Sequence, residues 1–109
     1  MSITAAANTL ILNSTIAVSI DNIDVISIYT TAEIFRKVPQ SIETISATER
    51  RYIFYLTEME GNGNITSLSL YGGTATATLG TGTQLCTQVV DIVKTSTKSL
   101  LVTWTAKVV

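Results

Sequence analysis

The sequence has no histidine, a single cysteine and a single proline among its 109 residues. Histidine is the commonest general base in catalysis and the commonest metal-binding side chain, so its absence removes both roles together. The lone cysteine, Cys86, excludes an intramolecular disulfide and a metal site built from several thiolates. We therefore expect a non-enzymatic protein that uses no metal and no cofactor.

Charge is also scarce. Charged residues make up 14% of the chain, with 7 basic and 8 acidic residues and a net charge of −1. A protein that binds nucleic acid needs a cluster of positive charge to neutralise phosphates, and none stands out, so we expect no nucleic-acid partner. No run approaches the roughly 20 consecutive apolar residues that a transmembrane helix requires, so we also expect no membrane partner.

The residues that are abundant are Ile, Val, Leu, Thr and Ser, which fit a pleated sheet. The clearest pattern lies between two glycine-containing turns at 61–63 and 72–73, where Leu68 and Leu70 alternate with polar residues. An alternation of this kind predicts a strand with one buried and one exposed face. The same pattern returns in the last segment of the chain, 99–109.

We therefore predict an all-β fold, a single antiparallel β-sandwich that spans residues 1–109. Residues 1–30 are expected to form N-terminal strands, 31–51 a polar connection, and 52–109 a β-meander. Within the meander, a strand is expected over 74–79 between two glycine turns.

At most one short helix is expected, near residues 31–37, because Thr31 can cap it and Pro39 would end it. A strand that continues from residue 23 is the alternative. Residues 15–20 and 23–29 are expected to pair as a hairpin through a turn at Asp21-Asn22. Seven side chains are expected in the core: Phe54, Leu56, Leu68, Leu70, Leu100, Val102 and Trp104.

Two acidic residues, Glu58 and Glu60, offer a pair of carboxylates with a spacing suited to catalysis. On one strand they would share a face at about 7 Å, where such a pair can hydrolyse a glycosidic bond. The simpler interpretation is a solvated strand end before a turn. The surrounding segment, 58–64, also offers oxygen ligands separated by glycines, as calcium loops do, and again a hairpin turn is the simpler interpretation. Cys86 is expected as a small buried residue of a strand.

Four tyrosines are the candidate interface residues: Tyr29, Tyr52, Tyr55 and Tyr71. Aromatic side chains of this kind fill cores and subunit interfaces, and they also stack on sugars when several are exposed on one face. The sequence leaves both possibilities open.

The C-terminal half carries a recurring order of elements. A glycine-flanked strand, Ile65 to Gly73, is followed by the turn Gly80-Thr81-Gly82, a long strand to Lys94, and a last strand over 99–109 that carries a Leu-x-Val-x-Trp motif from Leu100 to Trp104. Over residues 52–109 this order resembles small structural proteins of tailed bacteriophages, prophages and phage-tail-like particles.

The resemblance implies a structural component of the tail, baseplate or fibre-attachment region, located in the virion and assembled in the bacterial cytoplasm. It also implies a homo-oligomer, a ring or a trimer, that docks other virion proteins. The alternatives are a carbohydrate- or receptor-binding module at a fibre tip, which would contact a host-surface glycan, and a capsid decoration protein.

Overall fold

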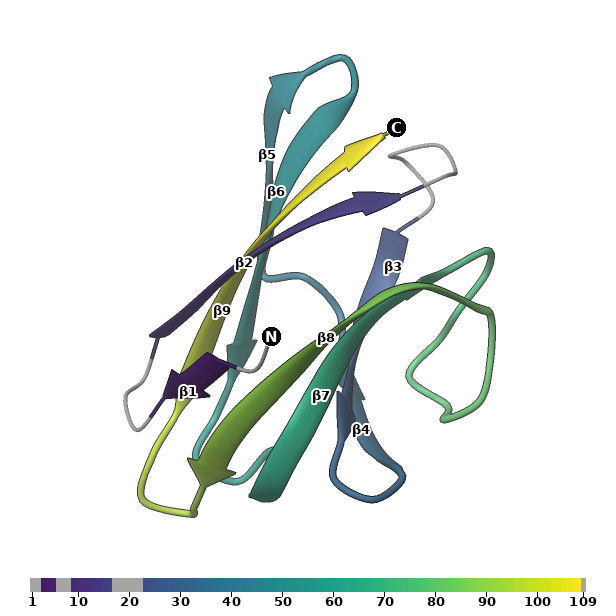
Figure 1. Cartoon of the computed structure of the whole chain (residues 1–109). Coiled ribbons are helices and arrows are strands. Elements are labelled where there is room, and N and C mark those ends of the chain that lie inside the picture. Colours follow the sequence, from purple (N-terminus) through teal and green to yellow (C-terminus); the bar gives the residue numbers. More distant parts are fainter. Residues whose placement is uncertain (1–2, 6–8, 17–22, 109) are drawn as a thin grey trace.

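The computed structural model describes residues 3–5, 9–16 and 23–108 (Figure 1). Within these ranges the chain forms nine strands and no helix. The strands are β1 (Ile3–Ala5), β2 (Thr9–Ile16), β3 (Ile23–Tyr29), β4 (Glu33–Lys37), β5 (Ser41–Ser46), β6 (Glu49–Leu56), β7 (Gly63–Gly72), β8 (Thr83–Lys94) and β9 (Leu100–Val108).

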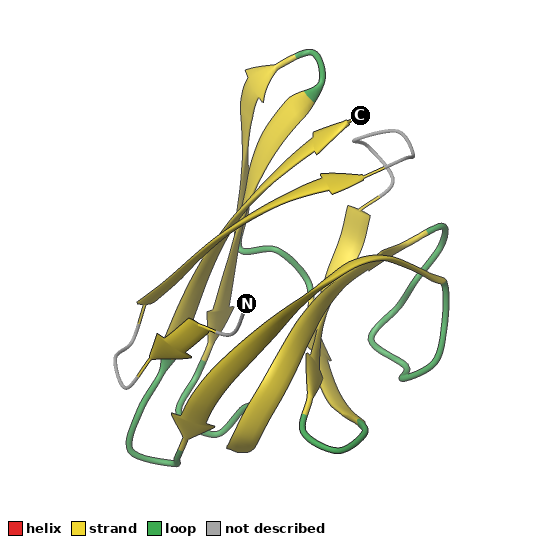
Figure 2. Ribbon diagram, viewed as in Figure 1, coloured by secondary structure: helices red, strands yellow, loops and turns green. Residues whose placement is uncertain are grey.

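The strands form two sheets that pack face to face as a β-sandwich, with loops at the ends of the layers (Figure 2). One sheet has five strands in the order β1-β8-β7-β3-β4, and the other has four in the order β2-β9-β6-β5. The predicted all-β class and sandwich architecture are confirmed.

The core lies between the sheets and follows the period-two pattern of each strand. All seven predicted core side chains are buried, and Trp104, at the centre of β9, has no exposed surface. The indole N–H of Trp104 donates a hydrogen bond of 3.0 Å to the hydroxyl of Ser14, which gives this buried polar atom a partner. Tyr52 stacks with Phe54 beside it, at 6.4 Å between ring centroids.

The expectation of purely antiparallel pairing is wrong at the N-terminus. β1 runs parallel to β8, and β2 runs parallel to β9, with Leu12 opposite Trp104. Parallel neighbours cannot be joined by a tight turn, so their partners must come from elsewhere in the chain. Here the two N-terminal strands add to the two last strands, one in each sheet.

The short helix predicted near 31–37 is also wrong, because residues 33–37 form β4, antiparallel to β3. The strand alternative was closer, although a turn separates the two strands, with the Thr30 N–H bonded to the Ala32 carbonyl at 3.1 Å. A helix of this length is marginal by itself, whereas antiparallel pairing with β3 gives the backbone of 33–37 hydrogen-bond partners in the sheet. Pro39 lies in the short segment where the chain passes from one sheet to the other.

The remaining corrections concern which strands are neighbours. Residues 31–51 are not a connection, since they contain β4, β5 and the start of β6. The segment 52–109 is not a meander, because β6 and β7 lie in different sheets, as do β8 and β9. The strand predicted over 74–79 belongs to a loop, residues 73–82. β2 and β3 lie in different sheets, so they do not pair, and the Asp21-Asn22 turn falls outside the described residues.

Candidate functional site

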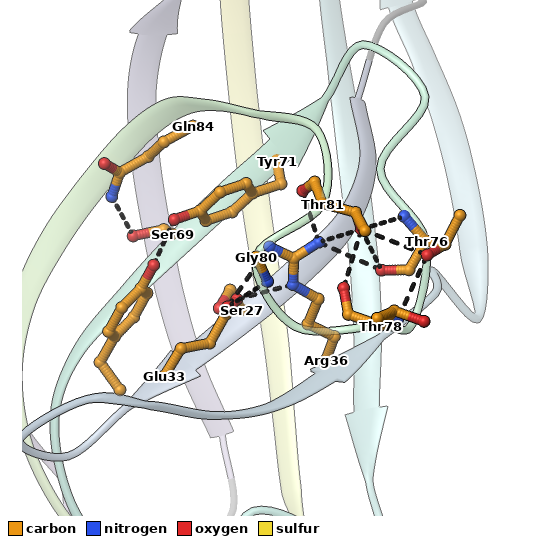
Figure 3. Close-up of polar contacts among 11 residues, drawn as sticks. Ser27, Glu33, Arg36, Ser69, Tyr71, Thr76, Thr78, Gly80, Thr81 and Gln84 are labelled. Atoms are coloured by element: carbon orange, nitrogen blue, oxygen red, sulfur yellow. Dashed lines mark hydrogen bonds and ion pairs between the residues drawn. The ribbon is translucent and has the colours of Figure 1, made fainter.

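The loop of residues 73–82 is fastened to the five-stranded sheet by a buried arginine of β4 (Figure 3). The Arg36 side chain has no exposed surface. One of its terminal nitrogens donates to the Thr76 carbonyl at 3.1 Å, the Thr81 carbonyl at 2.8 Å and the Thr81 hydroxyl at 3.0 Å. The guanidinium lies over the Tyr71 ring, 4.3 Å from its centroid, in the geometry of a cation–π contact.

Glu33 balances the charge of Arg36. Its carboxylate accepts a hydrogen bond of 2.6 Å from Arg36 Nε, one of 2.9 Å from the Gly80 backbone N–H, and another from the Ser27 hydroxyl. Burial by itself raises the pKa of Glu33, but the bonds from Arg36, Ser27 and Gly80 outweigh it and hold the pKa below its ordinary value. We call Glu33, Arg36 and Tyr71 the loop latch.

The loop latch continues into a chain of hydroxyl and amide groups across the outer face of the sheet. The hydroxyls of Tyr29 and Tyr71 are hydrogen-bonded to each other, and burial together with this bond raises the pKa of Tyr71 to about 12. Beside them, Gln84 Nε2 donates to the Ser69 hydroxyl at 2.7 Å, and that hydroxyl donates to Thr87 at 3.0 Å. These groups are engaged with one another, so the network stabilises a loop and a sheet face.

The four candidate interface tyrosines do not form one surface. Tyr29 and Tyr71 lie together, half-buried, on the outer face of the five-stranded sheet. Tyr55 is exposed on the four-stranded sheet. Tyr52 is only 1% exposed and belongs to the core, so its predicted place at a surface is wrong. The alternation of β6 assigns Tyr52 to the face that it shares with Phe54.

Glu58 and Glu60 lie in the loop between β6 and β7, not on one strand. The Glu60 carboxylate accepts bonds of 2.7 and 2.8 Å from Lys37 Nζ and one of 2.8 Å from the Thr57 N–H. The bond from Lys37 is the largest influence on the pKa of Glu60, and together with the bond from Thr57 it lowers that pKa. The Glu60 carboxylate therefore serves as the ion-pair partner of Lys37 and as an acceptor for the backbone of its own loop.

The oxygen-rich loop considered for calcium holds an ammonium group of the chain itself. Lys94 Nζ donates to the Thr57 carbonyl at 2.7 Å and to Asn62 Oδ1 at 2.8 Å. Burial lowers the pKa of Lys94, although the nearby Glu60 and Glu58 oppose that effect. Across the described ranges, no three carboxylate or thiol side chains come close enough together to bind a metal ion.

A polar pocket of about 550 Å³, which the sequence analysis did not anticipate, opens between the sheets at the edges of β2 and β8. Gln88 Nε2 donates to the Asn13 carbonyl and to the Ser14 hydroxyl, each at 2.9 Å, and so links the two edges. Burial raises the pKa of the Cys86 thiol in the pocket wall. The pocket is lined by Asn13, Ser14, Thr15, Glu49, Cys86, Thr87, Gln88, Thr105 and Lys107.

A signal for this pocket was present in the sequence. Leu10 and Leu12 point into the core, and the next inward position of β2 is Ser14. On β8, Val90 and Ile92 are buried and the preceding inward position is Gln88. Polar residues at inward-facing positions of two strands indicate where the apolar core ends and a polar space begins.

These features define a β-sandwich in which polar networks hold loops against a sheet and a polar pocket lies between two sheet edges. No protein-family model, curated protein or solved structure matches the chain. In the part of the chain that the structure describes, there is no helix with the length and apolar character that a membrane crossing requires.

Proposed function

We propose that the protein is a non-enzymatic structural subunit that self-associates through its edge strand β5. The observation that carries this proposal is the exposure of β5, since all six of its residues are exposed on both faces of the strand. Two of them are isoleucines, Ile42 at 52% and Ile45 at 45% exposure. Within the described residues β5 pairs on one side only, with β6, so its other side presents unpaired backbone N–H and C=O groups.

Another edge strand, β4, differs from β5 in the features that discourage pairing with a second chain, and this difference supports the proposal. β4 ends the five-stranded sheet with only five residues and a register shift in its ladder, and it carries the partly exposed Lys37 two residues before Pro39. Short length, irregular pairing, basic residues and proline are the devices that prevent an edge from pairing with another chain. β5 shares the irregular register, but it carries no lysine, arginine or proline and exposes two large apolar side chains.

The position of β5 supports a contact with little rearrangement. The β5–β6 hairpin extends beyond the other strands at one end of the sandwich, where it is accessible to a neighbour (Figure 1). Covering the exposed half of each isoleucine would contribute about 1 kcal/mol, in addition to the backbone hydrogen bonds of an added strand. A contact of this kind between copies of the chain suits a symmetric assembly.

The setting that we propose is a phage or phage-tail-like particle, in which the assembled subunits dock other virion proteins. The resemblance of residues 52–109 to small structural proteins of such particles supports this setting. The docking of other virion proteins fits a subunit that works through protein contacts.

A glycan-binding role is a second candidate, favoured by the adjacent hydroxyls of Tyr29 and Tyr71 on one face. Arg36 already covers one face of the Tyr71 ring, which leaves less aromatic surface for a sugar. A Tyr29→Ala variant that loses binding on a glycan array would support this role, and a protein that binds no glycan would exclude it.

The experiment is the solution mass of the purified chain, measured by light scattering during size-exclusion chromatography. We expect a discrete oligomer for the natural chain and a folded monomer for the Ile42→Lys/Ile45→Lys double variant. Val93→Lys is the matched control, because Val93 is a similarly exposed residue (56%) on β8, and this variant should still assemble. A natural chain that stays monomeric at high concentration would refute the proposal.

A further inference from the structure

A second unpaired edge lies in the five-stranded sheet. β8 has twelve residues, and β7 pairs with it along one side. On its other side, β1 pairs only with Val90, Asp91 and Ile92. Among the described residues, no strand pairs with this side of Thr83–Val89.

The polar pocket adjoins this unpaired part of β8, since Cys86, Thr87 and Gln88 belong to both. A strand that joined β8 here would match its free backbone groups and would direct every second side chain toward the pocket. The pocket wall offers hydroxyl and amide groups together with the charges of Glu49 and Lys107. The fitting occupant is therefore an extended segment with short polar side chains, and Lys107 offers a partner for an acidic residue in it.

We propose that this occupant is β5 of a second copy of the chain, and this proposal rests on the assembly role of β5 proposed above. β5 has six residues, close to the seven of the unpaired part of β8. Its sequence, Ser-Ile-Glu-Thr-Ile-Ser, provides hydroxyls and one acidic residue. Ser41 and Glu43 share one face of β5. With this face toward the pocket, Glu43, which is exposed and lies 3.5 Å from Arg51 of its own chain, would bring a carboxylate to the wall that carries Lys107.

The consequence is a head-to-tail contact between two different surfaces of the same molecule. Each subunit donates β5 to one neighbour and accepts β5 from another beside its own β8. A contact of this type generates a closed ring when its rotation closes and a filament when it does not. Pairing of β5 with β5 of a partner would instead be two-fold symmetric and would end at a dimer.

The only cysteine of the chain lies at the proposed contact, which allows a direct test by disulfide formation. Directly opposed residues of neighbouring strands have the spacing that a disulfide needs. Single cysteines are introduced at Ser41, Ile42, Glu43 and Thr44, one at a time, and the assembled protein is oxidised at alkaline pH. We expect Ser41→Cys or Glu43→Cys to form a disulfide with Cys86 of a neighbour, and Ile42→Cys and Thr44→Cys to form none.

When the same cysteine variants also carry Cys86→Ser, these disulfides should no longer form. In a second measurement, alkylation of Cys86 should be slower in the natural oligomer than in the Ile42→Lys/Ile45→Lys monomer. The oligomer could form and yet show disulfides only between the introduced cysteines of two subunits, or show no disulfides at all. Either result would refute the contact with β8 but not the assembly role of β5. If the natural chain is a monomer, both proposals fail.

Discussion

Arg36 lies on an edge strand, yet its replacement is expected to lower the stability of the protein substantially. Arg36→Ala removes the bonds to two loop carbonyls and leaves the Glu33 carboxylate without its ion-pair partner. The removal of one partner from a buried ion pair costs about 3–5 kcal/mol. For a domain of this size, that loss corresponds to a melting temperature lower by more than about 10 °C. Urea unfolding followed by tryptophan fluorescence measures it, since Trp104 is the only tryptophan.

The neighbouring residue provides the control. Lys37 also forms an ion pair with a glutamate, Glu60 at 2.7 Å, but the two side chains are 30% and 23% exposed. An accessible pair of this kind contributes less than about 1 kcal/mol, so Lys37→Ala should be close to neutral. If Arg36→Ala were no more destabilising than Lys37→Ala, the buried contacts of the loop latch would not contribute to the stability of the protein.

The pH dependence provides a second check on the loop latch. The pKa of Glu33 lies below its ordinary value of 4.5 in the folded protein, so its ionised form stabilises the fold above pH 4.5. This stabilisation is lost as the pH falls below 4.5 and through the folded pKa. The difference in stability between the natural chain and Arg36→Ala should therefore shrink on acidification. A constant difference would contradict the ionic contribution of Glu33.

Three further outcomes follow from single positions. In thermal unfolding, Gly82→Ala should destabilise the protein much more than Gly80→Ala. Both glycines have a positive φ, so both substitutions strain the backbone. A Cβ at position 82 would also lie 2.4 Å from a side-chain carbon, whereas a Cβ at position 80 would have no atom within 4 Å. Trp104→Ala should cost about 3–5 kcal/mol in urea, because the indole is fully buried. Tyr71, with its pKa raised to about 12, should make stability fall as the pH rises from 10 to about 12, and a Tyr29→Phe variant should titrate Tyr71 earlier by tyrosinate absorbance.

For strands such as β6, β7 and β9, the alternation in the sequence was sufficient to predict the buried face but not the neighbouring strand. The alternation of Leu100, Val102 and Trp104 predicted the inward face of β9 correctly, because the period of two follows from strand geometry alone. The same alternation says nothing about which strand lies beside β9. Its neighbour β2 comes from the far end of the chain, and such a pairing depends on the closure of the whole domain.

The candidate site was less predictable for a similar reason. Glu33 and Arg36 looked like ordinary charges in a short polar segment, and the loop that they fasten begins almost forty residues later, at Gly73. Their importance depends on burial, which the 73–82 loop creates. Ser14 and Gln88 occupy inward positions beside the buried apolar residues of β2 and β8, and this pattern, from which no pocket was predicted, marks the place of the pocket.

The passage from β4 to β5 connects the stable part of the molecule with its proposed assembly edge. These consecutive strands end opposite sheets, and only residues 38–40 separate them. Pro39 restricts the backbone there, and the N–H of Gln40 is bonded to the Ile53 carbonyl at 2.7 Å, so the hairpin leaves the body from a fixed point. An edge strand held in this way loses little conformational entropy when it pairs with a neighbour. It should therefore associate more tightly than a mobile segment of the same sequence would.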